Sequence, residues 1–414
     1  MLEPLGDLPS PPEPNYFHGE QLSFSDAELG ATRSSGDDDL NLRYATGEVR
    51  IVTEQARYPL NTISGMVSGD DYELNPEFQR RHRWNAGKQS RLIESFIMNV
   101  PVPPIFLYED EFSHYEVMDG LQRLTAISAF YNDELTLVGL EEWPELNGRK
   151  YSDLPEQIRR GVDRRYLSSI ILLRETAKTA LEAERLKQLV FERINSGGVA
   201  LKEQETRNAI YNGRLNKLCI KLSRNEHLCR MWGIPLPTPE EEAGDIPDEL
   251  EQNTHYRTMH DVELVLRFFA HRQRRRIGTG ALRTYLDSYL KKGNLYPEET
   301  LDNLESLFVE TIALVHEVLG DRAFWLWRFR HNKWGWLERP TTTAYDAFMF
   351  VFSQNLHRAP ALRAASDAFR KEIPAFYEQY VEYFDARMTN MRNLRERDSL
   401  VSLFVDKVLS RGSA

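Results

Sequence analysis

The feature that most constrains the fold is a change of hydrophobic period along the chain. Up to about residue 173, stretches that alternate apolar and polar residues, as strands do, are mixed with stretches of helical spacing. Beyond residue 257, apolar residues recur only at intervals of three and four, which is typical of helices packed on one another. We therefore predict an α+β N-terminal domain followed by an all-α domain.

The predicted elements of the N-terminal domain surround a joint at Asp119-Gly120. Strands are predicted at residues 49–53, 105–108, 115–118 and 166–173, and helices at 60–67, 121–131, 178–194 and from about 202. Asn85 is expected to cap a further helix whose apolar residues share one face. Asp119-Gly120 closes the second strand of a predicted β-hairpin and the next helix begins at once, so the joint exposes backbone N–H groups.

Composition predicts where the domains begin and end. Residues 1–46 are rich in Pro, Ser, Gly and acidic residues without a sustained hydrophobic period, so they are expected to form a largely unstructured tail. The mixed domain spans residues 47–235, an acidic linker with several prolines spans 236–256, and the helical domain spans 257–414. Helices of this last domain are predicted at residues 259–269, 282–290, 300–319, 345–356 and 367–384.

The formal net charge of −11 is unevenly distributed. Residues 1–50 hold ten acidic and three basic residues, and residues 239–251 hold seven acidic and no basic ones. The rest of the chain is therefore slightly basic, a balance that neither demands nor forbids contact with phosphates. The strongest positive patch is HRQRRR at residues 271–276, and a solvated helix end explains it as well as DNA binding does. Its predicted DNA-binding residues are Arg272, Arg274, Arg275 and Arg276.

The acidic tail is expected to mask this basic patch or to compete with DNA for it. If it does, removing the tail would strengthen DNA binding, and salt would weaken that binding steeply because counterions are released.

Several classes of protein are excluded by what the sequence lacks. Cys219 and Cys229 are the only cysteines, so neither a disulfide framework nor a four-thiolate zinc site is expected. No apolar run approaches the ~20 residues that cross a bilayer, and the first residues do not resemble a signal peptide, so we expect a cytoplasmic protein without membrane contact. Residues 197–202 lack the Walker A spacing, and neither a G-x-S-x-G elbow nor an H-E-x-x-H pair occurs.

Three clusters combine charged and polar residues with turn signals. Residues 76–84 (PEFQRRHRW) place arginines between aromatic residues, and guanidinium groups bind phosphate while aromatic rings stack on bases. Residues 119–123 (DGLQR) offer a carboxylate for a divalent metal, an amide to place a water and an arginine for phosphate. Residues 191–198 (FERINSGG) put two glycines where backbone can approach a ligand closely. Each cluster also has an ordinary explanation: surface ion pairs, a tight turn and a helix end.

At these clusters the sequence resembles a known family. The segments FQRRHRW, LIESFIMNVPVPPIFLYE, YEVMDGLQRLTAI and FERINSGGVALKEQE have the order and spacing of the ParB/sulfiredoxin-like family. This family includes the GmrS half of GmrSD modification-dependent restriction systems and the N-terminal domain of SspE-type phage-defence proteins. The resemblance covers about residues 47–235, continues more loosely through residues 257–270, and implies a ParB/sulfiredoxin-like fold for the N-terminal domain.

The resemblance also implies a function in restriction or antiphage defence. It implies binding and hydrolysis of GTP or another NTP with Mg²⁺, coupled to sensing of modified DNA and to nicking or cleavage of DNA by a separately encoded nuclease or effector. The oligomeric state stays open, a homo-oligomer included. The predicted catalytic residues are Asp119, Gln122 and Arg123, with Asp119 also as the magnesium ligand. The predicted nucleotide-binding residues are Gln79, Arg80, Trp84, Gly120, Arg193, Asn195 and Glu205.

The sequence departs from the family's pattern at two positions. Leu121 replaces the usual first glutamine of an Asp-Gly-Gln-Gln-Arg element, and His82 stands where a tyrosine is common. If that glutamine places the attacking water, hydrolysis here is slow or absent while binding survives. The alternative hypothesis is therefore a nonhydrolytic DNA-binding or scaffold protein that is gated by a nucleotide.

A self-contained nuclease is a third hypothesis. Full-length relatives often add an HNH-type nuclease domain with an H-x-x-P motif, and only His357-Arg358-Ala359-Pro360 fits its short form. Pro360 is explained equally well as a residue of a helix N-terminus, and no metal-binding sequel follows it. The resemblance thus implies a sensor or nucleotide-switch subunit that acts with a separate effector.

Overall fold

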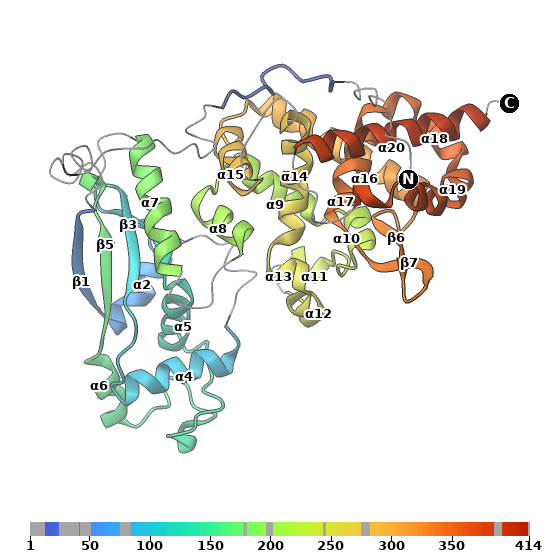
Figure 1. Cartoon of the computed structure of the whole chain (residues 1–414). Coiled ribbons are helices and arrows are strands. Elements are labelled where there is room, and N and C mark those ends of the chain that lie inside the picture. Colours follow the sequence, from blue (N-terminus) through green and yellow to red (C-terminus); the bar gives the residue numbers. More distant parts are fainter. Residues whose placement is uncertain are drawn as a thin grey trace. The chain divides into compact units, whose positions relative to one another are not determined.

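The computed structural model describes residues 13–24, 41, 51–74, 84–176, 180–195, 202–242, 246–274, 282–384 and 391–412 (Figure 1). The chain divides into two compact units. We call Arg33–Ile210 the sheet unit, and we call Met1–Thr32 together with Tyr211–Ala414 the helical unit. Within the described ranges, no helix is long and apolar enough to cross a membrane.

The sheet unit is built on a mixed five-stranded sheet in the order β1-β5-β3-β4-β2. Strands β1 and β5 are antiparallel, β5 and β3 parallel, β3 and β4 antiparallel, and β4 and β2 parallel. The strands are β1 (Thr53–Pro59), β2 (Tyr72–Glu73), β3 (Ile105–Glu111), β4 (His114–Asp119) and β5 (Tyr166–Leu172). The helices are α2 (Ile63–Ser68), α4 (Ala86–Ile97), α5 (Leu121–Tyr131), α6 (Glu156–Asp163), α7 (Ala180–Asn195) and α8 (Glu203–Ile210).

The core of the sheet unit lies between the sheet and its helices. On β3, Ile105 and Leu107 are fully buried two residues apart, as strand alternation requires. On α5, Leu124 and Ile127 are buried at helical spacing, and α5 packs on both α2 and α4. The side chain of Asn85 accepts a hydrogen bond from the N–H of Lys88, so the predicted cap of α4 is confirmed.

Most strands of the sheet unit lie where the sequence predicts them, and the first strand does not. The β3–β4 hairpin, β5 and the helix over residues 121–131 are confirmed. The first strand is predicted at residues 49–53, but β1 covers Thr53–Pro59, where all seven residues pair with β5. Because β1 is an edge strand with a mostly exposed surface, its residues carry little of the apolar alternation on which the prediction depends.

The helical unit packs its helices around a large apolar core. Its longer helices are α9 (Arg214–Ser223), α14 (His260–Arg274), α15 (Leu282–Gly293), α16 (Glu298–Leu319), α17 (Thr342–Gln354), α19 (Ser366–Gln379) and α20 (Met391–Gly412). Shorter helices are α10 (Glu226–Trp232), α11 (Pro239–Glu242), α12 (Asp248–Gln252), α13 (Thr254–Arg257) and α18 (Ala359–Ala364). Helix α17 is buried along almost its whole length, as is typical of a central helix.

The helical unit also contains a β-hairpin, so the expectation of an all-α domain is corrected to a mostly helical one. Strand β6 (Trp325–Arg330) pairs antiparallel with β7 (Lys333–Pro340). The turn residues His331 and Asn332 both have positive φ, 50° and 60°, which is the geometry of a tight hairpin turn. The signal was present in the sequence as alternating aromatic residues on either side of this turn.

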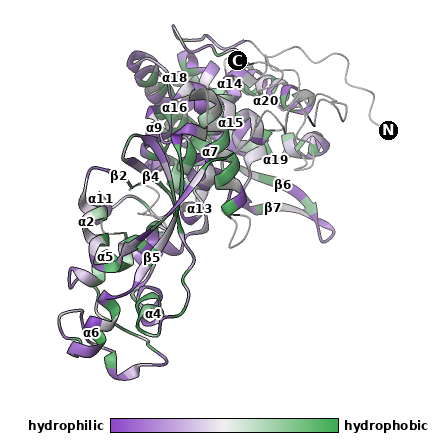
Figure 2. Ribbon diagram, turned by 90° about the vertical axis from the view of Figure 1, so that its left-hand side faces the viewer, coloured by the Kyte–Doolittle hydropathy of each residue, from purple (hydrophilic) through white to green (hydrophobic). Residues whose placement is uncertain are grey.

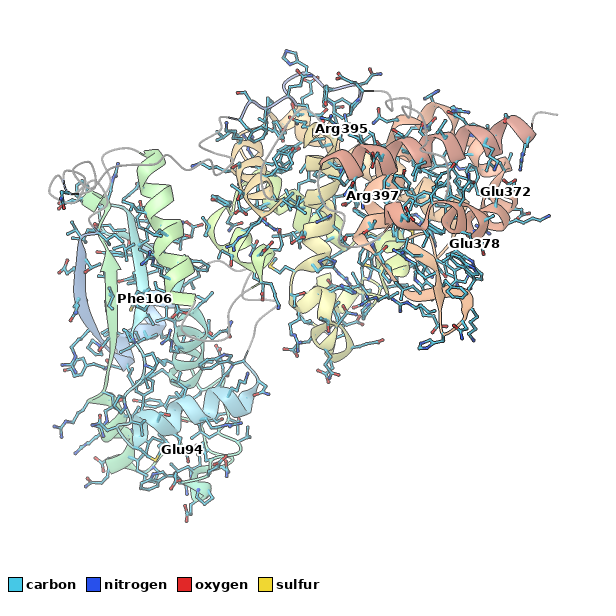
Figure 3. All side chains as sticks on the ribbon, viewed as in Figure 1. Glu94, Phe106, Glu372, Glu378, Arg395 and Arg397 are labelled. Carbon is cyan, nitrogen blue, oxygen red and sulfur yellow. The ribbon has the colours of Figure 1, made fainter. Side chains whose placement is uncertain are left out.

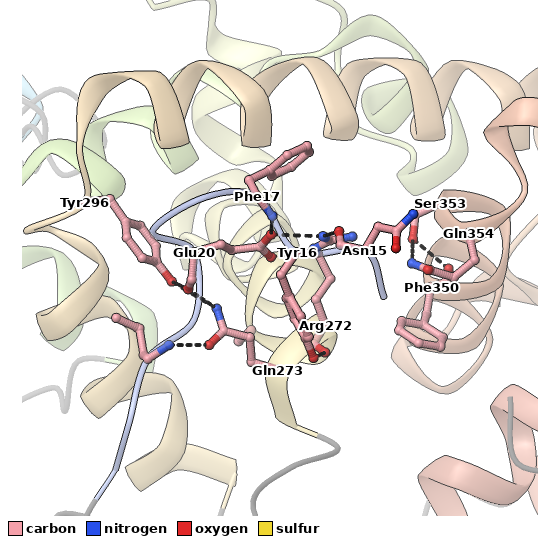
Figure 4. A network of polar contacts seen from close by, with 12 residues as sticks. Asn15, Tyr16, Phe17, Glu20, Arg272, Gln273, Tyr296, Phe350, Ser353 and Gln354 are labelled. Atoms are coloured by element: carbon pink, nitrogen blue, oxygen red, sulfur yellow. Dashed lines mark hydrogen bonds and ion pairs between the residues drawn. The ribbon is translucent and has the colours of Figure 1, made fainter. Parts of the chain in front are cut away.

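Residues 13–24 belong to the helical unit and pack on α14 (Figure 4). Glu20 is buried and forms an ion pair with the equally buried Arg272, whose guanidinium also donates to the carbonyl of Asn15. The Tyr16 hydroxyl donates in turn to the carbonyl of Arg272. This differs from the unstructured tail that composition predicts, because the partners of these residues lie about 250 positions away and composition cannot reveal them.

Candidate functional site

A cavity of about 500 Å³ opens beside the joint between β4 and α5 in the sheet unit. It lies at the predicted Asp119-Gly120 joint, where the strand ends and the helix begins without a linker. Its walls come from α4, the proline-rich loop before β3, the end of β4, the start of α5, α7 and α8. The lining residues are Trp84, Leu92, Ser95, Pro101, Val102, Pro103, Glu116, Val117, Met118, Asp119, Gly120, Leu121, Gln122, Arg123, Lys187, Phe191 and Ala209.

Gly120 makes this joint sterically feasible. Its φ of +99° is a left-handed conformation that L side chains rarely adopt, and it caps α5. A Cβ at this position would lie 2.3 Å from Cγ2 of Ile105, which is a fully buried residue of β3. Only glycine therefore lets β4 run directly into α5. The residues of the first turn of α5, Leu121 to Arg123, consequently lie at the cavity wall, and a helix N-terminus leaves N–H groups that can bind a ligand.

Arg123 is held in place by three acceptors at the cavity wall. Its Nη1 donates to the carbonyls of Pro103 and Pro104 at 2.6 and 3.2 Å, and its Nη2 donates to Oδ2 of Asp119 at 2.6 Å. The side chains of Arg123 and Asp119 are 11% and 37% exposed. Three of the five N–H groups of the guanidinium are used in this way, and the other two can donate to a ligand in the cavity.

Gln122 contacts the backbone of the residue that precedes α4. Its side-chain oxygen accepts from the N–H of Trp84 at 3.0 Å, while Nε2 of Gln89 donates to the carbonyl of Trp84 at 2.9 Å. The side chains of Gln122 and Gln89 thus bind the backbone N–H and the backbone carbonyl of Trp84. Since the oxygen of Gln122 is occupied, its NH₂ group is the part that can face a ligand.

Glu116 and Lys187 form an ion pair that the sequence did not single out. Glu116 lies on β4 and Lys187 on α7, and the pair joins the two elements at the cavity wall. Burial raises the pKa of the Glu116 carboxyl, and the attraction of Lys187 offsets part of that rise. The ammonium of Lys187 also lies 5.6 Å from the centre of the Tyr108 ring. The available signal was a glutamate inside an otherwise apolar strand, YEVMD.

The third predicted cluster contributes less to the cavity. Glu205 accepts from the N–H of Lys202, so its carboxylate caps α8 in the manner of a capping box. Arg193 is exposed on α7, and Asn195 is the last residue of that helix. Arg193 and Glu205 are not among the residues that line the cavity. The side chain of Asn195 lies outside the described residues, and so do Gln79 and Arg80.

The predicted DNA-binding arginines are only partly described. Arg272 is 2% exposed and paired with Glu20, so its guanidinium is not at the surface that the sequence suggested. Arg274 is the last residue of α14, and its side chain, like Arg275 and Arg276, lies outside the described residues. DNA binding by residues 274–276 therefore stays a prediction.

The described residues do not gather the donors of a metal centre. Within them, no group of three or more His, Cys, Asp or Glu residues could hold a metal ion, and this includes the surroundings of His357. Pro360 lies in the first turn of α18, as expected for a proline at a helix N-terminus. Of the two carboxylates that line the cavity, Glu116 is held by Lys187, and the more exposed Asp119 is the one that can reach an ion. A single carboxylate fits Mg²⁺ when phosphate oxygens and waters complete the six ligands, so the donor set fits a metal–nucleotide complex better than a resident metal.

Comparison with known proteins gives one family. Residues 63–212 match the GmrSD restriction endonuclease, N-terminal domain. The matched region begins with α2, covers strands β2 to β5 and the whole joint but not β1, and ends just after α8. No curated protein and no solved structure matches the chain.

Proposed function

Since residues 63–212 belong to the ParB/sulfiredoxin-like family of GmrSD restriction endonuclease N-terminal domains, the chain is related to the components of GmrSD modification-dependent restriction systems, and we propose that its sheet unit binds a nucleoside triphosphate. The bound nucleotide would control a separately encoded nuclease or effector. The observation that carries the proposal is the joint itself. Gly120 brings the N-terminus of α5, Asp119, Gln122 and Arg123 to the wall of one cavity.

The binding chemistry follows from the charges at the joint. A helix N-terminus and a guanidinium both attract phosphate, and Arg123 is already oriented by its contacts with Pro103, Pro104 and Asp119. Asp119 would hold Mg²⁺ directly or through water, and the ion would neutralise part of the phosphate charge. The largely apolar remainder of the wall, including Trp84 and Phe191, suits a base or ribose.

Whether the nucleotide is hydrolysed depends on which residue places the water. Gln122 is the candidate, but its oxygen accepts from the Trp84 N–H. Leu121, at the first position of α5, is buried in the apolar core of the unit. These two observations favour the second candidate function, a nonhydrolytic switch that binds a nucleotide and signals through its conformation. A ligand that draws the Gln122 oxygen away from Trp84 would restore the hydrolytic role.

Equilibrium binding of a labelled NTP to the full chain tests the first part of the proposal. Arg123→Ala and Gly120→Ala should each weaken binding, the first because a phosphate-binding guanidinium is removed and the second because the joint is distorted. Arg160→Ala is the matched control, because Arg160 pairs with Glu156 on the surface of the same unit. Circular dichroism checks that each variant folds. Parental affinity in Arg123→Ala would refute the phosphate assignment.

Phosphate release from a panel of NTPs, with and without modified DNA, tests the second part. A hydrolytic component releases phosphate, whereas a nonhydrolytic switch binds the same nucleotides without turnover. Leu121→Gln restores the residue that is usual in the family and should increase turnover if the departure has slowed it. An unchanged rate in a variant that still binds nucleotide would count against that explanation.

A further inference from the structure

The β6–β7 hairpin in the helical unit has two chemically different faces. Residues that pair across the strands share a face, so Trp327 lies beside Trp336 and Phe329 beside Trp334 on one side. The ring centres of these pairs are 5.4 and 5.6 Å apart, and both pairs are edge-to-face. The opposite side carries the basic residues that alternate with these rings.

The base of the hairpin is fixed to the helices of its own unit. The indole N–H of Trp327 donates to a carboxylate oxygen of Glu378 at 2.7 Å. Glu378 belongs to α19 and is labelled in Figure 3. The guanidinium of Arg328 donates to the backbone carbonyls of Val381 and Phe384, just beyond α19. An isolated two-stranded hairpin is only marginally stable in water, and these contacts supply the support that it lacks.

The tip of the hairpin, by contrast, extends away from the helices (Figure 2). Phe329 is 57% exposed there, although a phenylalanine gains most by burial. Arg330 and Lys333, which pair across the strands next to the turn, are both exposed. Among the described residues, neither of these two cations forms an ion pair. The tip therefore presents an unsatisfied aromatic surface and unpaired positive charge within a few residues.

The charge of the hairpin contrasts with that of the chain. Residues 322–340 (RAFWLWRFRHNKWGWLERP) contain five arginines and lysines and one glutamate, whereas the whole chain has a net charge of −11. A ligand that matches this segment must carry both negative charge and flat apolar surfaces. Unpaired nucleotides carry both, because phosphates pair with cations and every base has a face on which an aromatic ring stacks. An acidic peptide would satisfy the cations and leave the rings exposed.

We propose that the tip of the β6–β7 hairpin binds single-stranded nucleic acid. The rings of Phe329 and Trp334 stack on bases on one face of the hairpin. Arg330 and Lys333, on the other face next to the turn, contact the phosphates where the strand passes round the tip. This surface lies in the helical unit and does not include the nucleotide cavity of the sheet unit. It also does not include residues 271–276, which the sequence suggested as the DNA contact.

The test titrates the full chain, without nucleoside triphosphate, against a fluorescently labelled oligodeoxythymidine and against a labelled duplex. Phe329→Ala should weaken single-strand binding about 5- to 150-fold, since stacking on one ring contributes ~1–3 kcal/mol per base. Reversing both cations, Arg330→Glu with Lys333→Glu, should reduce the slope of log affinity against log salt by about 1.4, because each neutralised phosphate contributes ~0.7 to that slope. Phe329 and both cations are exposed, so these variants should fold as the parent does.

The sheet unit offers a matched control at the tip of its own hairpin. Phe112 is 84% exposed between β3 and β4, but its neighbours Asp110 and Glu111 are acidic. Phe112→Ala should therefore leave the affinity unchanged, and tryptophan fluorescence of the helical unit should be quenched by the single strand in this variant as in the parent. Parental affinity in Phe329→Ala, equal binding of duplex and single strand, or an equal loss in Phe112→Ala would each overturn the proposal.

Discussion

The buried ion pair between Glu20 and Arg272 gives a stringent test of how the helical unit is held together. The two side chains are 0% and 2% exposed, and hydrogen bonds of 2.7 and 3.0 Å join them. Glu20→Ala leaves a guanidinium buried without its carboxylate. Removing one partner of a buried pair costs about 3–5 kcal/mol, because the remaining charge keeps its desolvation cost and loses its attraction. Hydrogen bonds from the side chains of Gln273 and Tyr296 to the Glu20 carbonyl would still hold the segment.

Hydrogen exchange of the full chain measures this loss locally. A chain with two units has no single unfolding free energy, so exchange in α14 is compared with exchange in α5 of the sheet unit. Glu20→Ala should accelerate exchange in α14 and leave α5 unchanged. Glu372→Ala is the control, because Glu372 pairs with Arg411 at the surface, where such a pair contributes about 0–1 kcal/mol.

A double variant separates a coupled pair from two independent interactions. Glu20→Met with Arg272→Met removes both charges and keeps most of the buried volume, so it should lose less protection than either single variant, Glu20→Ala or Arg272→Ala. The reasoning is refuted if α14 in Glu20→Ala exchanges as slowly as in the surface control. It is equally refuted if the double variant loses as much as both single variants combined.

Two further predictions follow from the backbone of the joint and from half-buried histidines. Gly120→Ala should destabilise the sheet unit by well over the ~1–2 kcal/mol of a left-handed alanine, whereas Gly148→Ala, with a φ of +85° and open space around it, should cost only that amount; hydrogen exchange in α5 compares them. Burial lowers the pKa values of His227, His255 and His260, so their neutral forms are favoured by folding. Stability from these groups is complete above the unfolded value of about 6.5 and is lost as the pH falls below it. These three histidines lie in the helical unit, so protection of α14 that does not fall between about pH 7.5 and 5.5, after the intrinsic pH dependence of exchange is removed, would contradict this.

The elements that the sequence predicted well are those specified by neighbouring residues. The β3–β4 hairpin and α5 were foreseen because apolar alternation, an acidic turn and the Asp119-Gly120 pair all lie within about 30 residues. The Asn85 cap was foreseen for the same reason. In these segments local propensity and tertiary packing agree, so the local signal was sufficient.

The features that the sequence did not predict are contacts between residues far apart in the chain and a short hairpin between long helices. The Glu116–Lys187 pair joins residues 71 positions apart, and the Glu20–Arg272 pair joins residues 252 positions apart. No periodicity reports such contacts. The β6–β7 hairpin was overlooked because helical signals on both sides dominate and only two strands occur there, although Trp327, Phe329 and Trp334 carry the alternation.

Under the proposed function, the joint between β4 and α5 separates nucleotide binding from turnover in physical terms. Gly120 and Arg123 serve the fold whether or not a ligand binds, since one avoids a clash with Ile105 and the other ties the proline-rich loop to α5. A cavity shaped in this way persists whether or not water is activated in it. Leu121 belongs to the core, so a glutamine there would bury an amide or turn it into the cavity. Under the proposed function, turnover would therefore depend on Leu121 and Gln122, beside a binding geometry that the packing maintains by itself, and a loss of hydrolysis would not entail a loss of nucleotide binding.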